Sequence, residues 1–483
     1  MVGLDPYYYF RLAGEVLENG KVLLFDTWRN PPLGSDRGFD LFPYIMAYWS
    51  KFLAIFGVSR EMAHIIYPPV AMIGILIFFY LWVRLLVGKR IAIIASLFLA
   101  VIPGFVFRTA AGFADHEAIS IMFMFLSLWL FTKADLMKVS RNKYLMMFGS
   151  GLAAFGMGVT WVGYPMLIIV ISGYLLSKML LSKSRCGYPK YVWFLTFSAL
   201  MTLVGKLHWK SYGWLIGFFA FGVLLVYDLL KERKFFVPNS ILSLLVVGLG
   251  GLILNSLFGF FDIGTFILNI LNAGGGDKLA GTTSEIARTY VTSGNSYLDN
   301  YGYLTFISLF GVFFLSWELF SDVGKKIRII LSSIAVGSIF VITMGNWSSD
   351  FQILGSNYIY LMLSVLFGLV AYYLYLYYTR REEYNVLSNL NNINLIMPII
   401  FFLVMGLLAR TAVRFIFVFA PAVALLAAIA FEDFLKHAKR YKFAQLGVVL
   451  IIGLFDMLAM VNLTSNDPYW LGREPEGFVF VTM

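Results

Sequence analysis

The chain has 483 residues, of which 60% are hydrophobic and 13% are charged, and its mean hydropathy is +0.80. This composition lies far outside that of soluble globular domains, so water is excluded as the main solvent of the protein. The net charge of +10 does not indicate nucleic acid binding, because the basic residues form short clusters between apolar runs instead of one basic stripe. The single cysteine, Cys186, excludes an intramolecular disulfide and a multi-cysteine metal site.

The residues before the first long apolar run are predicted to form an external segment, residues 1–57. Within it, Leu41 to Phe56 is apolar but carries Lys51 and is only about 16 residues long, which favours an interfacial helix over a membrane span. No signal peptide or first span precedes Leu4, although the segment is expected to be translocated. We therefore expect that a leading helix is missing or that the true start lies upstream.

Apolar runs recur from about Met62 to Met460, and each is long enough to cross roughly 30 Å of hydrocarbon as a helix. They predict an all-α polytopic membrane protein with about 12–14 transmembrane helices in a domain over residues 58–462. The run at 192–205 is short, so a neighbouring pair could fail to span, which would leave twelve helices. The predicted spans are 62–86, 91–107, 118–136, 143–159, 163–181, 192–205, 212–230, 239–259, 303–321, 327–344, 357–378, 394–409, 412–431 and 443–461.

Clusters of lysine and arginine fall in every second loop, and by the positive-inside rule these loops are cytoplasmic. Both termini are then external, and so is a second long segment, residues 262–302, which contains the flexible run Gly274 to Gly276. The clusters are Lys89/Arg90, Lys133 to Lys143, Lys178 to Lys190, Lys231 to Lys234, Lys325 to Arg328, Arg380/Arg381 and Lys436 to Lys442.

Carboxylates near a membrane are costly, so those at the ends of spans are the first candidates for function. Three external sites carry them: Asp5 near the start, the pair Asp115 and Glu117 at the mouth of a span, and Thr282–Glu285 in the second long segment. Asp115 and Glu117 could both turn their oxygens toward one point, and Asp5 would complete an oxygen-rich site. Such a hard site suits Mg²⁺ or Mn²⁺.

Each of these residues also has a simpler structural interpretation. Asp115 could cap the helix that follows, with Glu117 in the first turn favourably placed in the helix dipole. Asp5 could be a solvated acid near a terminus, and Thr282–Glu285 could be a capping box. We expect His116 to be a loop residue and not a ligand, because the neighbouring carboxylates are better partners for a hard cation.

Taken together, these motifs resemble the oligosaccharyltransferase catalytic subunit family, called STT3 in eukaryotes, AglB in archaea and PglB in bacteria. The chain is most like an archaeal AglB-type transmembrane region. The similar features are a first acidic motif, an aromatic and proline-containing passage, an Asp-x-Glu motif introduced by arginine, a Thr-x-x-Glu loop and a late arginine helix. In chain order they are Asp5–Arg11, Phe25–Trp28, Pro32–Gly34, Arg108–Ala118, Thr282–Glu285 and Arg410–Pro421.

The resemblance implies a GT-C-type glycosyltransferase, a dolichyl-(pyro)phosphooligosaccharide-protein glycotransferase. Such an enzyme would transfer an oligosaccharide, with inversion, from a dolichol-type lipid (pyro)phosphate donor to the asparagine of N-x-S/T sequons in an acceptor polypeptide. It would lie in the lipid bilayer of an archaeal cell with its active face extracellular, or lumenal in the endoplasmic reticulum of a eukaryote.

The resemblance also implies roles for particular residues. Asp5, Asp115 and Glu117 would hold a catalytic Mn²⁺ or Mg²⁺, which would neutralise charge on the leaving lipid pyrophosphate. Glu285 would bind the acceptor amide, while the loop 262–302 would close over it as a lid.

By the same resemblance, Arg414 would contact the donor pyrophosphate, and guanidinium geometry suits phosphate oxygens. The alternative interpretation is that Arg414 anchors its helix at the external membrane interface, a role that Arg410 could already fill. Two features of the family are missing: the helix before the first acidic motif, and the external domain that opens with Trp-Trp-Asp-Tyr-Gly. Residues 463–483, with Asp467 to Arg473, look like the approach to that domain, so we expect a truncated chain.

Two other classes remain open at this point. Lipid-phosphate-sugar-dependent mannosyltransferases share many helices but would place an acidic pair near the start, whereas the pair here is Asp115 and Glu117. An ion-coupled transporter would place ionisable residues near the midplane of broken helices, and the predicted spans carry few interior charges.

Overall fold

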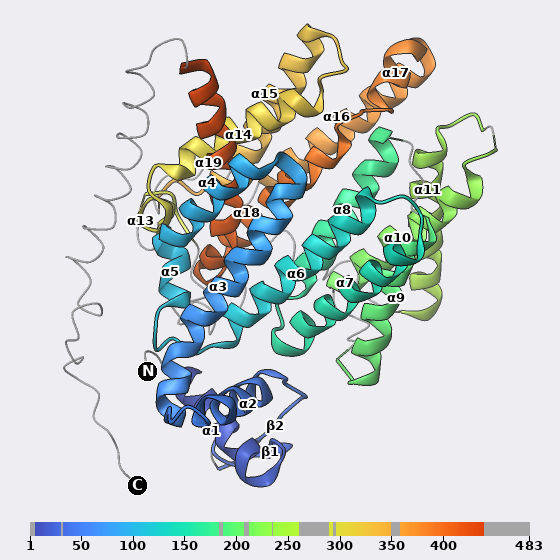
Figure 1. Ribbon diagram of the computed structural model, residues 1–483. Helices are drawn as coiled ribbons and strands as arrows, with labels where there is room; N and C mark the ends of the chain where they lie inside the picture. Colours follow the sequence, from blue (N-terminus) through green and yellow to red (C-terminus); the bar gives the residue numbers. More distant parts are fainter. Residues whose placement is uncertain are drawn as a thin grey trace.

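The computed structural model shows a bundle of α-helices with a small N-terminal layer at one end (Figure 1). This architecture confirms the predicted all-α fold. The structure describes residues 5–29, 32–182, 187–206, 212–233, 235–259, 289–292, 296–348 and 358–438.

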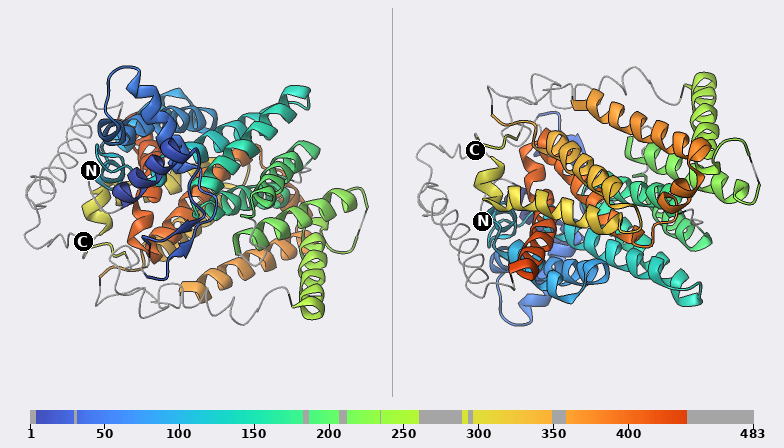
Figure 2. Two further views of the ribbon diagram at one scale, coloured as in Figure 1. Left: turned by 90° about the horizontal axis from the view of Figure 1, so that it is seen from below. Right: turned by 90° about the horizontal axis from the view of Figure 1, so that it is seen from above.

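The N-terminal layer lies below the ends of the bundle helices and contains two helices and a strand pair (Figure 1). These are α1 (Asp5–Asn19), the antiparallel β1 (Phe25–Asp26) and β2 (Ser35–Asp36), and α2 (Phe42–Ala54). Seen from below, α1 and α2 lie across the end of the bundle (Figure 2). At 13 residues, α2 reaches about 20 Å, too short to cross roughly 30 Å of hydrocarbon, in keeping with the prediction of a short, non-spanning helix over 41–56.

Apolar side chains spaced three and four residues apart hold α1 against α2, as expected for helices that each bury one stripe. Backbone and indole hydrogen bonds then fix the layer to the bundle. The Trp49 indole donates to the Ala63 carbonyl at 2.8 Å, and the Leu41 amide donates to the Val159 carbonyl at 3.0 Å. The buried stripe comprises Tyr9, Leu12, Ala13 and Val16 of α1 with Phe42, Met46 and Ala47 of α2.

The bundle follows in chain order. Its elements are α3 (Arg60–Val87), α4 (Lys89–Val101), α5 (Pro103–Thr109), α6 (His116–Leu136), α7 (Arg141–Thr160), α8 (Pro165–Ser182), α9 (Tyr188–Leu203), α10 (Tyr212–Leu230), α11 (Asn239–Phe258), α13 (Tyr297–Tyr301), α14 (Leu304–Leu319), α15 (Lys325–Met344), α16 (Tyr358–Thr379), α17 (Arg381–Leu387), the 3₁₀ turn η4 (Ile393–Leu395), α18 (Ile396–Thr411), the 3₁₀ turn η5 (Val413–Phe415) and α19 (Ile416–Ala438).

Among the described residues, 8 helices are long and apolar enough to cross a membrane, or up to 9 if a bent pair is one span. Every predicted span falls on a helix except 443–461, which lies outside the described residues. The span predicted at 91–107 differs, because α4 and α5 meet there at a bend of 66°. Pro103 explains the break, since it has no N–H to donate to the preceding turn and begins α5 instead.

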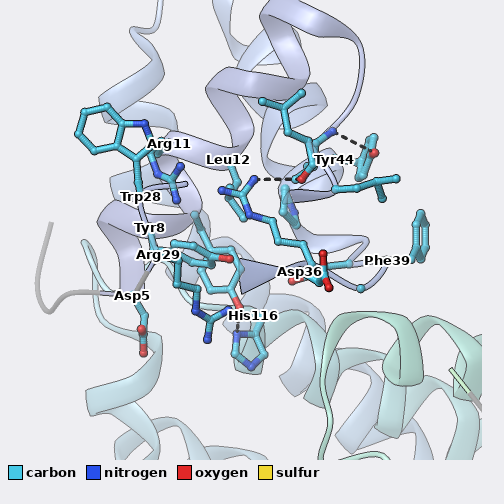
Figure 3. A pocket seen from close by; sticks show the side chains of 18 of the residues that line it. Asp5, Tyr8, Arg11, Leu12, Trp28, Arg29, Asp36, Phe39, Tyr44 and His116 are labelled. Atoms are coloured by element: carbon cyan, nitrogen blue, oxygen red, sulfur yellow. Dashed lines mark hydrogen bonds between the residues drawn. The ribbon is translucent and has the colours of Figure 1, made fainter. Parts of the chain in front are cut away.

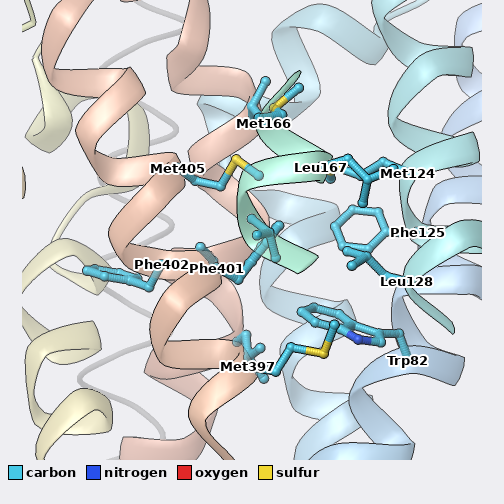
Figure 4. Close-up of a cluster of buried hydrophobic side chains, with 14 of the residues drawn as sticks. Trp82, Met124, Phe125, Leu128, Met166, Leu167, Met397, Phe401, Phe402 and Met405 are labelled. Atoms are coloured by element: carbon cyan, nitrogen blue, oxygen red, sulfur yellow. The ribbon is translucent and has the colours of Figure 1, made fainter. Parts of the chain in front are cut away.

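The centre of the bundle is α19, most of whose residues are buried. It packs against α4, α14 and α18. Gly311 of α14 allows a close approach of α14 to α19, because a Cβ at this position would collide with the backbone of Leu426. A second part of the core joins α3, α6 and α18, where Trp82 lies 5.2 Å from Phe401 between ring centroids (Figure 4).

The far end of the bundle from the N-terminal layer contains a buried ion cluster. The Asp135 carboxylate of α6 lies 2.7 Å from the Lys178 ammonium of α8 and 3.0 Å from the Lys190 ammonium of α9. The Tyr174 hydroxyl donates to the same carboxylate at 2.6 Å. Lys178 and Lys190, which the positive-inside rule uses to predict topology, therefore also join α6, α8 and α9. The spacing of apolar residues along the sequence does not indicate this contact.

Candidate active site

The start of α6 carries the predicted acidic pair. Asp115 is the N-cap residue, with an extended backbone, and its carboxylate accepts the His116 backbone N–H at 2.6 Å. Glu117 follows in the first turn, and both acids are buried, at 3% and 7% exposure. The helix-cap interpretation is thus confirmed, and it leaves the remaining carboxylate oxygens for other partners.

The prediction that His116 is a loop residue is wrong, because the cap at Asp115 makes His116 the first residue of α6. Its ring Nδ1 lies 2.7 Å from the Tyr9 hydroxyl of α1 and 2.5 Å from the Asp115 carboxylate. His116 therefore links the first acidic motif to the second across the interface between the N-terminal layer and the bundle.

Arg108, in the last turn of α5, reaches both acids. Its Nη1 lies 3.3 Å from Glu117 Oε2 and 3.9 Å from Asp115 Oδ2, and the arginine itself is buried at 9% exposure. The connection back to α6 turns at Gly112, which has φ 94°, a value that favours glycine. Burying a charged side chain is costly unless an opposite charge pairs with it, so the two carboxylates and the guanidinium stabilise one another in this buried group.

The Asp115 carboxyl is held in its charged form. Burial alone would raise its pKa, but hydrogen bonding and charge from His116, together with the charge of Arg108, outweigh burial and lower the pKa. Asp115 is therefore a carboxylate at neutral pH in spite of its burial.

The Tyr9 hydroxyl marks where further acids converge. Burial raises the pKa of Tyr9, and the negative charges of Asp40, Asp115 and Asp5 raise the same pKa further. Asp5 is the first residue of α1 and is exposed. The structure thus brings Asp5 and Asp115, which are far apart in sequence, to the surroundings of one phenol.

Asp40 is a further acid of this site, and no sequence motif indicates it. It lies two residues before α2, and its Oδ1 accepts the Phe42 backbone N–H at 2.9 Å. Burial raises the pKa of Asp40, while that backbone bond and the charges of His116 and Lys206 oppose the rise. An acid just before an apolar helix is a cap signal in sequence, but its position beside His116 is a tertiary feature.

A cavity of about 740 Å³ opens beside these residues, between the N-terminal layer and the bundle (Figure 3). Asp5, Asp40 and His116 all line it. Lys206, which follows α9, closes one side, and its ammonium donates to the Val159 carbonyl at 3.1 Å. The carboxylates are therefore placed where a molecule the size of a substrate can approach them.

Within the described part of the chain, no three Asp, Glu, His or Cys side chains are placed together as ligands of one metal ion. Asp115 and Glu117 share Arg108, and Asp5 lies at the cavity. The ligand set of Asp5, Asp115 and Glu117 therefore stays a prediction. Carboxylate oxygens are the kind of ligand that a hard divalent cation prefers. Arg108, however, already supplies positive charge to Asp115 and Glu117.

The other predicted residues divide into two cases. Glu285 and its Thr-x-x-Glu segment lie outside the described residues. Arg414 is exposed in η5, with its guanidinium 5.1 Å from the centroid of the Phe415 ring. Its proposed contact with phosphate stays a prediction.

Arg410 differs from expectation, because it is buried at 3% exposure and is not an interfacial anchor. Its guanidinium donates to the Val341 carbonyl at 2.7 Å and the Ile342 carbonyl at 3.0 Å, near the C-terminus of α15. These bonds satisfy carbonyls that lack helical partners. Arg410 thus cannot fill the anchoring role, and both interpretations of Arg414 remain open.

Comparison with known proteins identifies the family. The family model described as "Oligosaccharyl transferase STT3, N-terminal" matches residues 1–466. The chain belongs to this family. Membership confirms the family expected from the motifs and argues against the mannosyltransferase and transporter alternatives.

Similar proteins are found in both an archaeon and a plant. One is dolichyl-phosphooligosaccharide-protein glycotransferase 2 of Archaeoglobus fulgidus, 28% identical over 165 residues, which are 34% of this chain and 26% of the relative. Another is dolichyl-diphosphooligosaccharide–protein glycosyltransferase subunit STT3B of Arabidopsis thaliana, 28% identical over 202 residues, which are 39% of this chain and 26% of the relative.

A solved structure shares the fold. The archaeal oligosaccharyltransferase AglB from Archaeoglobus fulgidus, in complex with an inhibitory peptide and a dolichol-phosphate, matches with a TM-score of 0.61 at 16% identity. The match covers 97% of this STT3-family chain and 51% of AglB, so the chain spans about half the length of this relative.

Proposed function

We propose that this chain is the membrane-embedded catalytic part of an oligosaccharyltransferase. It transfers an oligosaccharide from a dolichol-type lipid (pyro)phosphate to the asparagine of N-x-S/T sequons. STT3 membership supports the reaction class, and a similar structure, of an Archaeoglobus fulgidus oligosaccharyltransferase, is described as tethered with an acceptor peptide containing the NVT sequon. The observation that carries the proposal is the buried group of Asp115, Glu117 and Arg108 beside a cavity of about 740 Å³.

The acceptor asparagine needs help from the enzyme. An amide nitrogen is a poor nucleophile because its lone pair is delocalised, and the resonance gives a rotation barrier of roughly 18–20 kcal/mol in a peptide bond. A fixed carboxylate that accepts the amide N–H can hold and orient this nitrogen. Asp115 is charged, and Asp5 lines the cavity, so both are suited to this role. Glu285 would act in the same way from the loop 262–302, which would close as a lid.

The departing lipid phosphate carries negative charge that fixed cations stabilise. Arg414 is exposed and available to a ligand, and its planar guanidinium can make a two-pronged contact with phosphate oxygens. Displacement at the anomeric carbon from the opposite side then inverts its configuration.

A divalent cation is the expected cofactor. Asp5, Asp115 and Glu117 would hold Mn²⁺ or Mg²⁺, and a bound cation of this kind would supply neutralising charge at the leaving phosphate. A similar structure, of an Archaeoglobus fulgidus oligosaccharyltransferase, is described as a complex with Zn and sulfate and matches with a TM-score of 0.56 at 14% identity.

The chain is a multi-pass membrane protein of the STT3 family, and we place it in an archaeal cell membrane with the N-terminal layer on the extracellular face. In a eukaryote this face would be lumenal. The alternation of basic loops supports this orientation.

A transfer assay tests the function directly. Full-length protein in nanodiscs is given a dolichyl-phosphate-linked oligosaccharide, a divalent cation and either of two peptides, one with Asn-Val-Thr and a control with Gln-Val-Thr. The expected result is a glycan mass added to the first peptide and not to the second. Equal modification of both peptides, or of neither, would contradict the proposal.

A further inference from the structure

The cavity beside the acidic group is larger than the approach of one asparagine requires. Its volume of about 740 Å³ lies within the range of roughly 300–1,000 Å³ that is typical of sites for whole small-molecule ligands. Its walls come from α1, the segment between α1 and α2, the start of α2, the start of α6, the α7–α8 connection and Lys206, which follows α9.

One wall is held rigid by a buried ion network. Arg11 lies 2.6 Å from the Asp26 carboxylate, and Arg37 lies 2.8 Å from Glu15 and contacts Asp26 as well. Asp26 is only 1% exposed, and both arginines hold its pKa well below the usual range in spite of burial. The strand pair is thereby fixed on α1, so the residues that follow Asp26 are presented from a stable base.

Aromatic rings line the same cavity, and two of them are open to a ligand. Trp28 is 78% exposed and Phe39 is 41% exposed, although both line the cavity. Tyr8 and Tyr44 are half-buried beside them. Rings of this kind offer flat apolar faces together with polar edges, which suits ligands that have both apolar faces and hydroxyl groups.

The charged groups on the walls are of both signs. The cations are Arg11, Arg29, Arg37 and Lys206, and the acids are Asp5, Asp36 and Asp40. Because Glu15 and Asp26 pair with two of these arginines, neither sign dominates, and a strongly anionic or cationic ligand is not favoured. A sugar hydroxyl both donates and accepts, so neighbouring carboxylates and guanidinium groups can bind the same ring.

We propose that this cavity binds neutral sugar residues of the donor glycan that follow the sugar at the reaction centre. The inference rests on the proposed function and adds to it a specificity site on the N-terminal layer. Asp5 and His116 join the cavity to the acidic group, so a glycan whose first sugar lies at Asp115 can extend into it. Tyr8 and Trp28 supply aromatic surface, and Arg29, whose guanidinium lies over the Tyr8 ring at 5.6 Å from its centroid, supplies hydrogen-bond donors beside that surface.

Donor-binding affinities test the proposal in full-length protein in nanodiscs. The probes are dolichyl phosphate alone and dolichyl phosphate carrying one or three neutral hexoses. The trisaccharide donor should bind more tightly than the monosaccharide donor, and Trp28→Ala and Tyr8→Ala should each remove about tenfold of this gain, equivalent to about 1.4 kcal/mol. Tyr7→Ala is the matched control, because Tyr7 lies on the same helix, is 55% exposed and does not line the cavity.

The outcomes separate this inference from the proposed function. If none of the three lipids binds, the proposed function fails. If all bind but the trisaccharide gains nothing, or its gain survives in Trp28→Ala and Tyr8→Ala, the sugar site is wrong. A loss of affinity for the acceptor peptide in these variants, with donor binding unchanged, would assign the cavity to the acceptor and also overturn the inference.

Discussion

Removing Arg108 should lower the free energy of unfolding, because Asp115 and Glu117 lose the positive charge that stabilises them. The substitution Arg108→Met keeps most of the side-chain volume but leaves Asp115 and Glu117 buried beside no guanidinium. Two unit charges 4 Å apart attract by about 4 kcal/mol at an effective dielectric of 20, and the observed separations are 3.3 and 3.9 Å. Desolvation offsets much of this attraction, but breaking a buried pair on one side costs roughly 3–5 kcal/mol.

The loss should depend on pH in a defined direction. Because the folded-state pKa of Asp115 is depressed, its contribution to stability is present above the unfolded-state pKa and disappears as pH falls through the folded-state pKa. Arg108→Met removes one cause of the depression and raises the pKa of Asp115. The variant should therefore lose stability at a higher pH than the wild type on acidification.

Thermal unfolding in detergent at several pH values measures this effect. The double variant Arg108→Met with Glu117→Gln should recover part of the stability lost in Arg108→Met, because it removes one of the stranded charges. Arg141→Met, at an exposed position at the start of α7, is the control for loss of an arginine. Unchanged stability in Arg108→Met, or no recovery in the double variant, would refute the account of this group.

Three further substitutions test other parts of the structure. Asp26→Asn should loosen the strand pair from α1 by roughly 1.5–3 kcal/mol, since two arginines lose a charged hydrogen-bond partner and keep Glu15, and limited proteolysis between α1 and α2 should become faster. Gly311→Ala should destabilise the α14–α19 contact by about 1–3 kcal/mol in thermal unfolding, whereas Gly250→Ala, where a Cβ meets nothing within 4 Å, should not. Arg414→Ala should weaken donor binding about 10- to 100-fold, since hydrogen bonds from charged groups to phosphate contribute roughly 1.5–3 kcal/mol each. Arg414→Lys should recover only part of that loss. Full recovery by lysine would show that Arg414 is an interfacial anchor.

Much of the fold could be predicted because the length of an apolar run can be read directly from the sequence, without knowledge of which segments contact one another. Long apolar runs predicted the long described helices of the bundle, and the short run with Lys51 was correctly separated from them as α2. The bend at Pro103 was not predicted, although proline carried the signal. Apolar content alone does not distinguish one span from two helices at an angle.

The candidate site was only partly predictable, because its geometry depends on contacts between distant residues. Asp115 and Glu117 could be found from their spacing at a span end. The contact between Tyr9 and His116 joins residues 107 positions apart, and no local pattern indicates it. Asp40 was missed for the same reason, since its neighbours in sequence suggest a helix cap and its neighbour in space is His116.

The kinetics of Asp115→Asn test most directly that the acidic group at the start of α6 is the reaction centre. Asparagine keeps the size of the side chain and can still cap the helix, and Arg108 keeps Glu117 as a partner. We therefore expect the variant to fold, with a loss of stability that thermal unfolding measures, and its donor affinity is measured alongside the rate. The rate of glycan transfer to an Asn-Val-Thr peptide should fall by roughly 10²-fold or more, as expected when a fixed charged group at a reaction centre is removed. Transfer at the wild-type rate by a folded, donor-binding Asp115→Asn protein would contradict the account.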